Sequence, residues 1–171
     1  MIQIYFGDGK GKTTAALGLS MRAFGHGQKV AIIFFDKGGH DYNERKVLEK
    51  LCIDYFSFGR DRRLIEGIFD FSLKNEDLLM AEKSMAKLRE IHNDYDLIVL
   101  DEVLNAIRLK MMPLQELVDY LDKELPKDLE LVLTGRGRFE ELENRADLIS
   151  EMKLIKHYFE KNIPAREGIE Y

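Results

Sequence analysis

The sequence contains no tryptophan, one cysteine and three prolines in 171 residues. Cys52 therefore has no partner for an intramolecular disulfide, as expected of a cytosolic protein. No apolar run approaches the roughly 18 to 20 residues that a membrane-spanning helix needs. Asp8, Lys10 and Lys12 interrupt the first apolar stretch too early for a secretory signal peptide. We expect a cytoplasmic protein that does not associate with membranes.

The chain also lacks an excess of positive charge. Its 26 Lys and Arg residues against 31 Asp and Glu residues give a formal net charge of −5. Without a global positive field, nucleic acid is not an expected partner, and an anionic ligand needs a local site. The composition is 45% hydrophobic and 33% charged without low-complexity tracts, which is typical of a folded protein. The length suits one domain spanning residues 1–171.

Short apolar segments alternate with segments of helical periodicity. The apolar segments predict strands at residues 2–6, 30–35, 53–58, 97–100, 129–134 and 148–152. Helices are predicted at residues 12–24, through Val47 to Leu51, and at 76–92, 114–125 and 139–145. Strands that are apolar throughout are buried on both faces, so the pattern favours an α/β fold with a mostly parallel central sheet in a three-layer α/β/α domain. In such sheets ligands bind beyond the carboxyl ends of the strands.

A glycine-rich loop joins the first strand to the first helix, with the sequence Gly7-Asp8-Gly9-Lys10-Gly11-Lys12-Thr13-Thr14. Its backbone N–H groups and the helix N-terminus suit phosphate oxygens, Lys12 suits a phosphate, and the Thr13 hydroxyl suits Mg²⁺. The strict pattern G-x-x-x-x-G-K-[ST] requires glycine where this chain has Phe6, so the loop is a variant that starts at Gly7. The motif predicts an ATP-binding domain like those of phosphate-loop NTPases. A glycine turn without a ligand is the less favoured interpretation.

Two other strand ends carry polar residues. Asp101 and Glu102 follow the strand at residues 97–100, where one or both would complement Thr13 as oxygen ligands of Mg²⁺. One of the two carboxylates could instead cap the next helix. Arg136 stands between two glycines after the strand at residues 129–134. Its guanidinium could clamp a polyphosphate or be solvated on a tight turn, and the residues alone favour neither.

Two weaker features remain. The segment Lys37-Gly38-Gly39 follows the second strand and is either a ligand loop or a flexible connection. The charge run Arg60-Asp61-Arg62-Arg63 could contact an anionic partner, but we interpret it as a solvated surface, the usual state of such a run.

Four segments together resemble the ATP:corrinoid adenosyltransferases of the phosphate-loop class. They are GDGKGKTTAALGLSMRAFGHGQKVAIIFFDKG, IVLDEVLNAI, LVLTGRG and the closing ISEMKLIKHYFEKNIPAREGIEY, in register over nearly the whole chain. This family transfers the 5′-deoxyadenosyl group of ATP to the Co(I) of a reduced corrinoid and releases triphosphate. The one-glycine-short loop also resembles theirs, in which the triphosphate runs in the reverse direction. Co(I) is itself the nucleophile, so no side-chain nucleophile is required.

The resemblance implies roles for the motif residues. The amides of residues 7–14 and Lys12 would neutralise the leaving triphosphate, Mg²⁺ would bridge Thr13 and either Glu102 or Asp101, and Arg136 would approach from the opposite side. Lys10 and Asp8 would line the loop. Lys12, Glu102 and Arg136 are the predicted catalytic residues. The resemblance further implies a homodimer, and a flavoprotein is a candidate reductant.

The chain departs from the family in one segment. Many relatives carry a Phe-Thr-Trp element after the third strand that helps replace the lower ligand of the corrinoid, and this chain has no Trp; Phe69 and Phe71 are candidate substitutes. The competing functions are an ordinary ATPase or small-molecule kinase, and a protein that binds ATP or a corrinoid without catalysis. The former would yield ADP and phosphate or a phosphorylated acceptor, and the latter would show no turnover.

Overall fold

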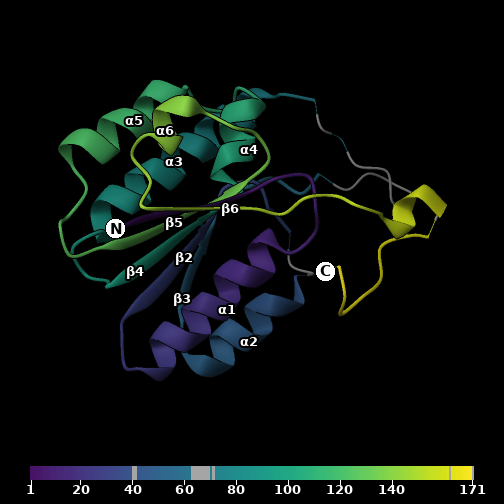
Figure 1. The fold of residues 1–171 in the computed structure, drawn as a ribbon, viewed down its shortest axis with the longest axis horizontal. Coiled ribbons are helices and arrows are strands. Elements are labelled where there is room, and N and C mark those ends of the chain that lie inside the picture. The colour runs from purple at the N-terminus through teal and green to yellow at the C-terminus, as the bar shows by residue number, and fades with distance from the viewer. Residues whose placement is uncertain (40–41, 63–69, 71, 162, 171) are drawn as a thin grey trace.

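The computed structural model describes the chain apart from residues 40–41, 63–69, 71, 162 and 171. The described residues form a six-stranded sheet in the order β3-β2-β4-β5-β1-β6, and every pairing is parallel (Figure 1). The strands are β1 (Ile2–Phe6), β2 (Val30–Phe34), β3 (Asp54–Ser57), β4 (Leu97–Asp101), β5 (Glu130–Gly135) and β6 (Leu148–Glu151). The predicted α/β fold is confirmed, and the predicted strands all form with small shifts at their ends.

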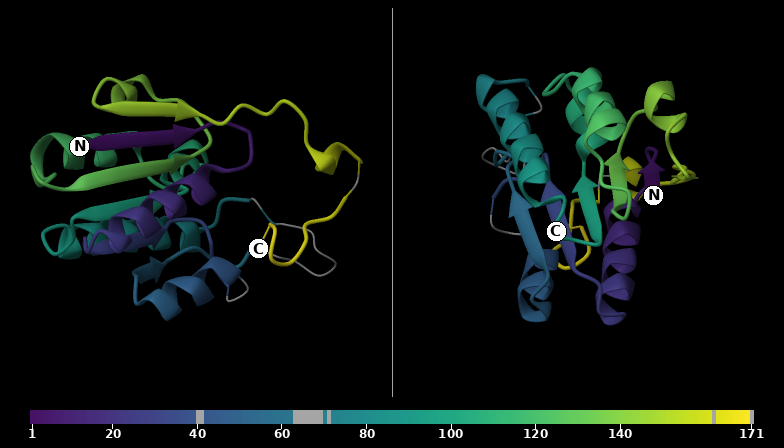
Figure 2. Two further views of the ribbon diagram at one scale, coloured as in Figure 1. Left: turned by 60° about the horizontal axis from the view of Figure 1, so that its bottom comes forward. Right: turned by 90° about the vertical axis from the view of Figure 1, so that its left-hand side faces the viewer.

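Helices cover both faces of the sheet (Figures 1 and 2). One face carries α1 (Lys12–Gly25) and α2 (Asn43–Leu51). The other carries α3 (Asn75–Ile91), α4 (Val103–Arg108), α5 (Leu114–Lys123) and α6 (Glu140–Glu143). After β6 the described part of the tail is mostly extended and includes a 3₁₀ turn at Tyr158–Lys161. No helix in the described part of the chain is long and apolar enough to cross a membrane.

Alternate residues of the central strands build two cores. Ile33 of β2, Leu100 of β4 and Leu133 of β5 are fully buried against α3, α4 and α5, whereas Ile32 and its neighbours across the sheet pack under α1 and α2. Each such side chain contributes about 1.5–3 kcal/mol of hydrophobic stabilisation. The strands are therefore held firmly, and their carboxyl ends provide a fixed edge for the loops that follow.

The prediction that the charge run after β3 is a solvated surface is wrong for Arg60 and Arg62. Arg60 is 8% exposed and Arg62 is 6% exposed. Both guanidinium groups donate to Asp77 Oδ1, at 2.9 Å from Arg60 Nε and 3.1 Å from Arg62 Nη2. Arg60 also contacts Asp70, and Arg62 Nε donates to Asp36 at 2.5 Å. Arg60 and Arg62 therefore form a buried ion-pair cluster with acidic partners from outside the run, whereas Asp61 between them is exposed.

The arginine cluster joins the loop after β2 to the start of α3. The proposed aromatic substitutes Phe69 and Phe71, like Arg63, lie outside the described residues. Of the described residues beside them, Asp70 donates its N–H to the Arg62 carbonyl at 2.7 Å.

Candidate active site at the carboxyl edge of the sheet

Strand order brings four polar residues together at one edge. Because β4 lies between β2 and β5, and β1 lies beside β5, the carboxyl ends of these strands are neighbours. Thr13 follows β1, Lys37 follows β2, Asp101 ends β4 and Thr134 lies in β5. They converge where ligands bind in open parallel sheets, as the sequence predicts for Thr13 and Asp101.

Asp101 lies at the centre of this arrangement and is buried. Its Oδ1 accepts hydrogen bonds from the hydroxyls of Thr13 and Thr134, both at 2.8 Å. Its Oδ2 lies 2.8 Å from Lys37 Nζ. The carboxylate is thereby fixed in orientation by three different elements, a prerequisite for a precise ligand or cation site.

Glu102 adopts a left-handed backbone conformation with φ of 63°, and its N–H donates to Thr134 Oγ1 at 3.0 Å. For a residue other than glycine this conformation costs about 1–3 kcal/mol and is found disproportionately at functional sites. Burial, followed by the neighbouring charge of Asp101, raises the pKa of Glu102 to about 7. Its buried Oε2 has no hydrogen-bond partner among the described residues. A cation bound beside Glu102 would stabilise its buried negative charge and would give Oε2 a partner.

Lys12 is 7% exposed, and its ammonium donates to the Gly9 carbonyl at 2.8 Å. Burial lowers the pKa of Lys12; the negative charge of Glu102 opposes this effect and the positive charge of Arg136 adds to it. The side chain is therefore folded over the glycine loop, within the electrostatic influence of both other predicted catalytic residues.

The loop glycines have a packing role that the motif does not reveal. The backbone of Met152, just after β6, passes so close that a Cβ would lie 2.5 Å from its carbonyl oxygen at Gly7 and 2.6 Å at Gly9. The Gly9 N–H donates to this same oxygen at 2.7 Å. One loop amide is thus engaged by the tail, and no side chain fits at either position without moving backbone.

Other predicted loop residues lie at the surface. Asp8 and Thr14 are exposed. Lys10 Nζ contacts the C-terminal tail, donating to Tyr158 Oη at 3.0 Å, the Ile169 carbonyl at 2.9 Å and Glu170 Oε1 at 2.7 Å. These contacts raise the pKa of Lys10, chiefly through Glu170. The ammonium is therefore tied to the tail in this structure.

Arg136 is exposed on the turn after β5. Its backbone N–H donates to Asn105 Oδ1 of α4 at 3.1 Å, which fixes the turn against that helix. The open position of the guanidinium suits a ligand at the loop.

Sequence reasoning underrated Lys37 and overlooked the positioning role of Thr134. Burial opposes the charge of Lys37, but Asp101 and Glu102 outweigh it and raise the pKa of the ammonium. Lys37 Nζ also donates to Thr13 Oγ1 at 3.0 Å. The sequence contains a signal for Lys37, because it follows a predicted apolar strand as Asp101 and Arg136 do, and this position places it at the same edge of the sheet.

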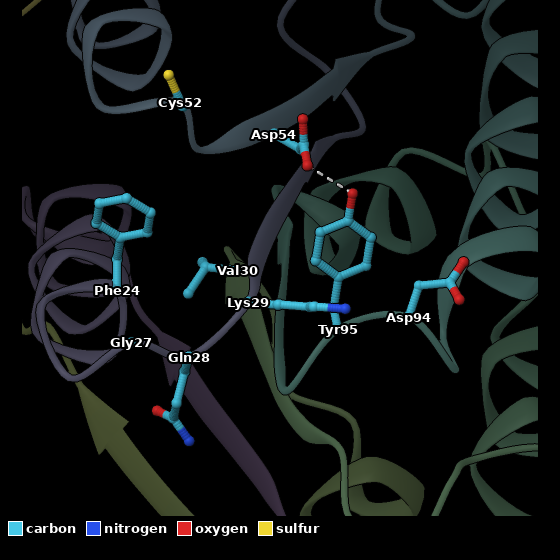
Figure 3. Close-up of a pocket in the computed structure, with 9 residues that line it drawn as sticks. All are labelled: Phe24, Gly27, Gln28, Lys29, Val30, Cys52, Asp54, Asp94 and Tyr95. Carbon is cyan, nitrogen blue, oxygen red and sulfur yellow. Dashed lines mark hydrogen bonds between the residues drawn. The ribbon is translucent and has the colours of Figure 1, made fainter.

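A pocket of about 520 Å³ lies at the opposite, amino ends of β2, β3 and β4 (Figure 3). Its lining includes Lys29, Cys52 and Tyr95, whose hydroxyl donates to Asp54 Oδ2 at 2.7 Å. None of the residues predicted for the site contributes to it. The pocket and the predicted site residues therefore lie at opposite edges of the sheet.

Comparison with known proteins matches the chain to one family. Residues 1–171 fit the family model described as ATP:corrinoid adenosyltransferase BtuR/CobO/CobP. A corrinoid adenosyltransferase of Sinorhizobium sp is 37% identical over all of this chain and 80% of its own length. Corrinoid adenosyltransferases of Escherichia coli K12 (32% identical) and Salmonella typhimurium LT2 (31% identical) match all of this chain and 85% of their own lengths. These matches show that the chain belongs to the ATP:corrinoid adenosyltransferase family of transferases.

Proposed function

We propose that the edge built by Lys12, Thr13, Asp101 and Glu102 holds ATP for attack by the Co(I) of a reduced corrinoid. The cobalt electron pair forms the Co–C5′ bond while the C5′–O bond breaks, and both electrons of that bond leave with triphosphate. The convergence of the phosphate loop with the buried Asp101 and with the unpartnered Glu102 Oε2 is the observation that carries this proposal. The attacking atom comes from the substrate, so the protein's task is to position C5′ and stabilise the leaving group.

Lys12 stabilises the triphosphate in this proposal. Its ammonium donates to the Gly9 carbonyl, an acceptor that a phosphate oxygen replaces when ATP binds. Amides of residues 7–14 assist, apart from that of Gly9, whose N–H is held by Met152. Burial keeps water away from the Lys12 ammonium. Because charges attract more strongly where water is excluded, an anion bound beside it gains a strong electrostatic interaction.

Mg²⁺ fits the oxygen-rich set of Thr13, Asp101 and Glu102. A hydroxyl and two carboxylates are hard ligands, and Mg²⁺ characteristically combines such ligands with water and substrate phosphates. When bound, the ion would neutralise charge on the triphosphate. Each carboxylate keeps one buried oxygen that accepts no hydrogen bond in the described part of the chain, Glu102 Oε2 and Asp101 Oδ2, and the second of these is paired with Lys37.

Arg136, Lys10 and Asp8 complete the proposed ATP site. The exposed Arg136 guanidinium approaches the triphosphate across the loop from Lys12, and Asp8 lines the loop surface. Lys10 contributes when its contacts with the tail open.

The partners and location are proposed on the same basis. Beyond ATP and the reduced corrinoid, we propose a flavoprotein as electron donor, a homodimer and a cytoplasmic location. The edge strand β6 supports self-association, because Leu148 is 44% exposed and Ile149 is 42% exposed there.

Two substitutions test the assigned roles. Lys12→Ala should abolish adenosyl transfer through loss of phosphate stabilisation, a decrease of about 10²–10³ in kcat or more. Glu102→Gln should weaken Mg²⁺ binding, so that the rate responds to Mg²⁺ only at higher concentrations, while the folded structure stays intact. An active Lys12→Ala enzyme with normal ATP affinity would contradict the role of Lys12. A Glu102→Gln enzyme with a wild-type Mg²⁺ titration would make Asp101 the preferred ligand.

A further inference from the structure

Lys37 contributes a positive charge at the place where the proposed metal ligands meet. Its Nζ lies 2.8 Å from Asp101 Oδ2 and 3.0 Å from Thr13 Oγ1. The Lys37 side chain is 16% exposed, and that of Asp101 is 1% exposed. Thr13 donates its own hydroxyl proton to Asp101 Oδ1, so the oxygen lone pair of Thr13 faces the ammonium. Lys37 therefore occupies the same oxygen lone pairs that a divalent cation would use.

The backbone of Lys37 is held while its side chain reaches back to this edge. Ser57 Oγ donates to the Lys37 carbonyl at 2.6 Å, and Arg45 Nη2 of α2 donates to the same oxygen. The ammonium also lies 5.5 Å from the ring centroid of Phe34 and 5.8 Å from that of Tyr42. The fold therefore fixes the backbone of Lys37 beside the site, and two aromatic rings flank its ammonium.

A second acceptor lies beside the ammonium. Glu44 Oε1 of α2 is 3.8 Å from Lys37 Nζ, and the Glu44 side chain is 23% exposed, more than Lys37 itself. A modest rotation of the flexible lysine side chain toward Glu44 would move its charge away from Thr13 and Asp101 without leaving it unpaired. An ammonium and a divalent cation cannot share the same oxygens, since their charges repel at contact distance.

We propose that Lys37 is a built-in counter-ion that holds the Thr13–Asp101 site in the absence of metal and is displaced toward Glu44 when the cation binds. This inference rests on the metal site in the proposed function. Lys37 thereby sets the affinity of the site for a cation. The protein folds with the charge of Asp101 neutralised, and an incoming metal ion must compete with the ammonium.

Mn²⁺ alone, titrated without nucleotide or corrinoid and followed by its EPR signal, tests the proposal without relying on catalysis. Lys37→Met removes the charge and adds no oxygen ligand. It should bind Mn²⁺ about tenfold more tightly than wild type, because one positive charge no longer competes at the site. The matched control is Lys46→Met on α2, an exposed lysine that donates only to Asn43 among the hydrogen bonds of the described residues, and its affinity should equal that of wild type.

The thermal unfolding of the same variants gives a second measurement. Lys37→Met leaves Asp101 buried without its counter-ion, so its melting temperature should fall without metal and rise more than that of wild type when Mn²⁺ is added. Unchanged or weaker Mn²⁺ binding by folded Lys37→Met would overturn the inference and leave the metal site standing. Absence of Mn²⁺ binding by both wild type and variant would overturn the metal site and this inference together.

Glu44→Gln keeps the test decisive if Lys37→Met does not fold. Removing the alternative partner should make displacement of the ammonium harder and weaken Mn²⁺ binding by about threefold, the scale of a partly exposed ion pair. In the Lys37→Met background, Glu44→Gln should not change the Mn²⁺ affinity, because there is no longer an ammonium for Glu44 to pair with. Glu44→Gln with wild-type Mn²⁺ affinity would refute the proposed displacement toward Glu44.

Discussion

The buried arginine cluster predicts an unusually costly single substitution, Asp77→Asn. Asp77 is fully buried in the first turn of α3. Its Oδ1 accepts from both Arg60 and Arg62, and its Oδ2 accepts the backbone N–H of Lys74 at 2.9 Å. The substitution preserves side-chain size but removes the charge shared by two buried guanidinium groups.

The expected loss in the free energy of unfolding depends on which carboxylate partners each arginine retains. Breaking a buried ion pair costs about 3–5 kcal/mol because the remaining charge is left desolvated. Arg60 retains Asp70 and Arg62 retains Asp36, so we expect the low end, about 3 kcal/mol. For a chain of this size that lowers the melting temperature by about 6–12 °C.

Urea unfolding followed by circular dichroism measures this loss. Asp122→Asn is the matched control, because Asp122 accepts from Arg145 at 2.6 and 2.7 Å but its side chain is 43% exposed. The control should unfold nearly as wild type does, since solvent already screens the pair. Equal stability of the two variants would refute the reasoning that burial makes the arginine cluster structural.

Two further predictions concern the loop and the strand end. Gly9→Ala should destabilise the fold by about 1–3 kcal/mol, as for other overpacked positions, because its Cβ would lie 2.6 Å from the Met152 carbonyl oxygen. Gly18→Ala, in the interior of α1 where an added Cβ would meet no atom within 4 Å apart from its chain neighbours and the backbone of its own helix, should instead stabilise the fold by about 0.5–1 kcal/mol. If urea unfolding showed that both substitutions destabilise the protein, or that both stabilise it, the close packing at Gly9 would be contradicted. Thr134→Val should cost about 1–3 kcal/mol in the same assay, because Asp101 loses a donor and the Glu102 N–H loses its acceptor. A Thr134→Val protein as stable as wild type would show that this network is not needed.

The sequence predicts the parts of the site that lie next to their strands. Continuous apolar strands identify the parallel sheet, and the rule that ligands bind at strand carboxyl ends places Thr13 and Asp101 at one edge. Their hydrogen bond of 2.8 Å agrees with that expectation. These predictions hold because they depend on short stretches of chain and on the general geometry of parallel sheets.

The contacts that sequence reasoning missed depend on strand order and on the path of the tail. Lys37 reaches Asp101 because β2 lies beside β4, a neighbour relation that chain order does not reveal. Arg62 is buried because Asp36 and Asp77, 26 and 15 residues away, meet it in space. Gly9 is constrained by the backbone of Met152, which follows β6 and is 143 residues away in the sequence.

The identity of the phosphate product tests the central claim most directly. The protein is incubated without oxygen with ATP, Mg²⁺ and a chemically reduced Co(I) corrinoid, and the products are resolved by ion chromatography and by the absorbance of the corrinoid. Adenosyl transfer predicts triphosphate and a light-sensitive cobalt–carbon product in equal amounts. ADP with phosphate, a phosphorylated acceptor, or ATP left unchanged would contradict the account.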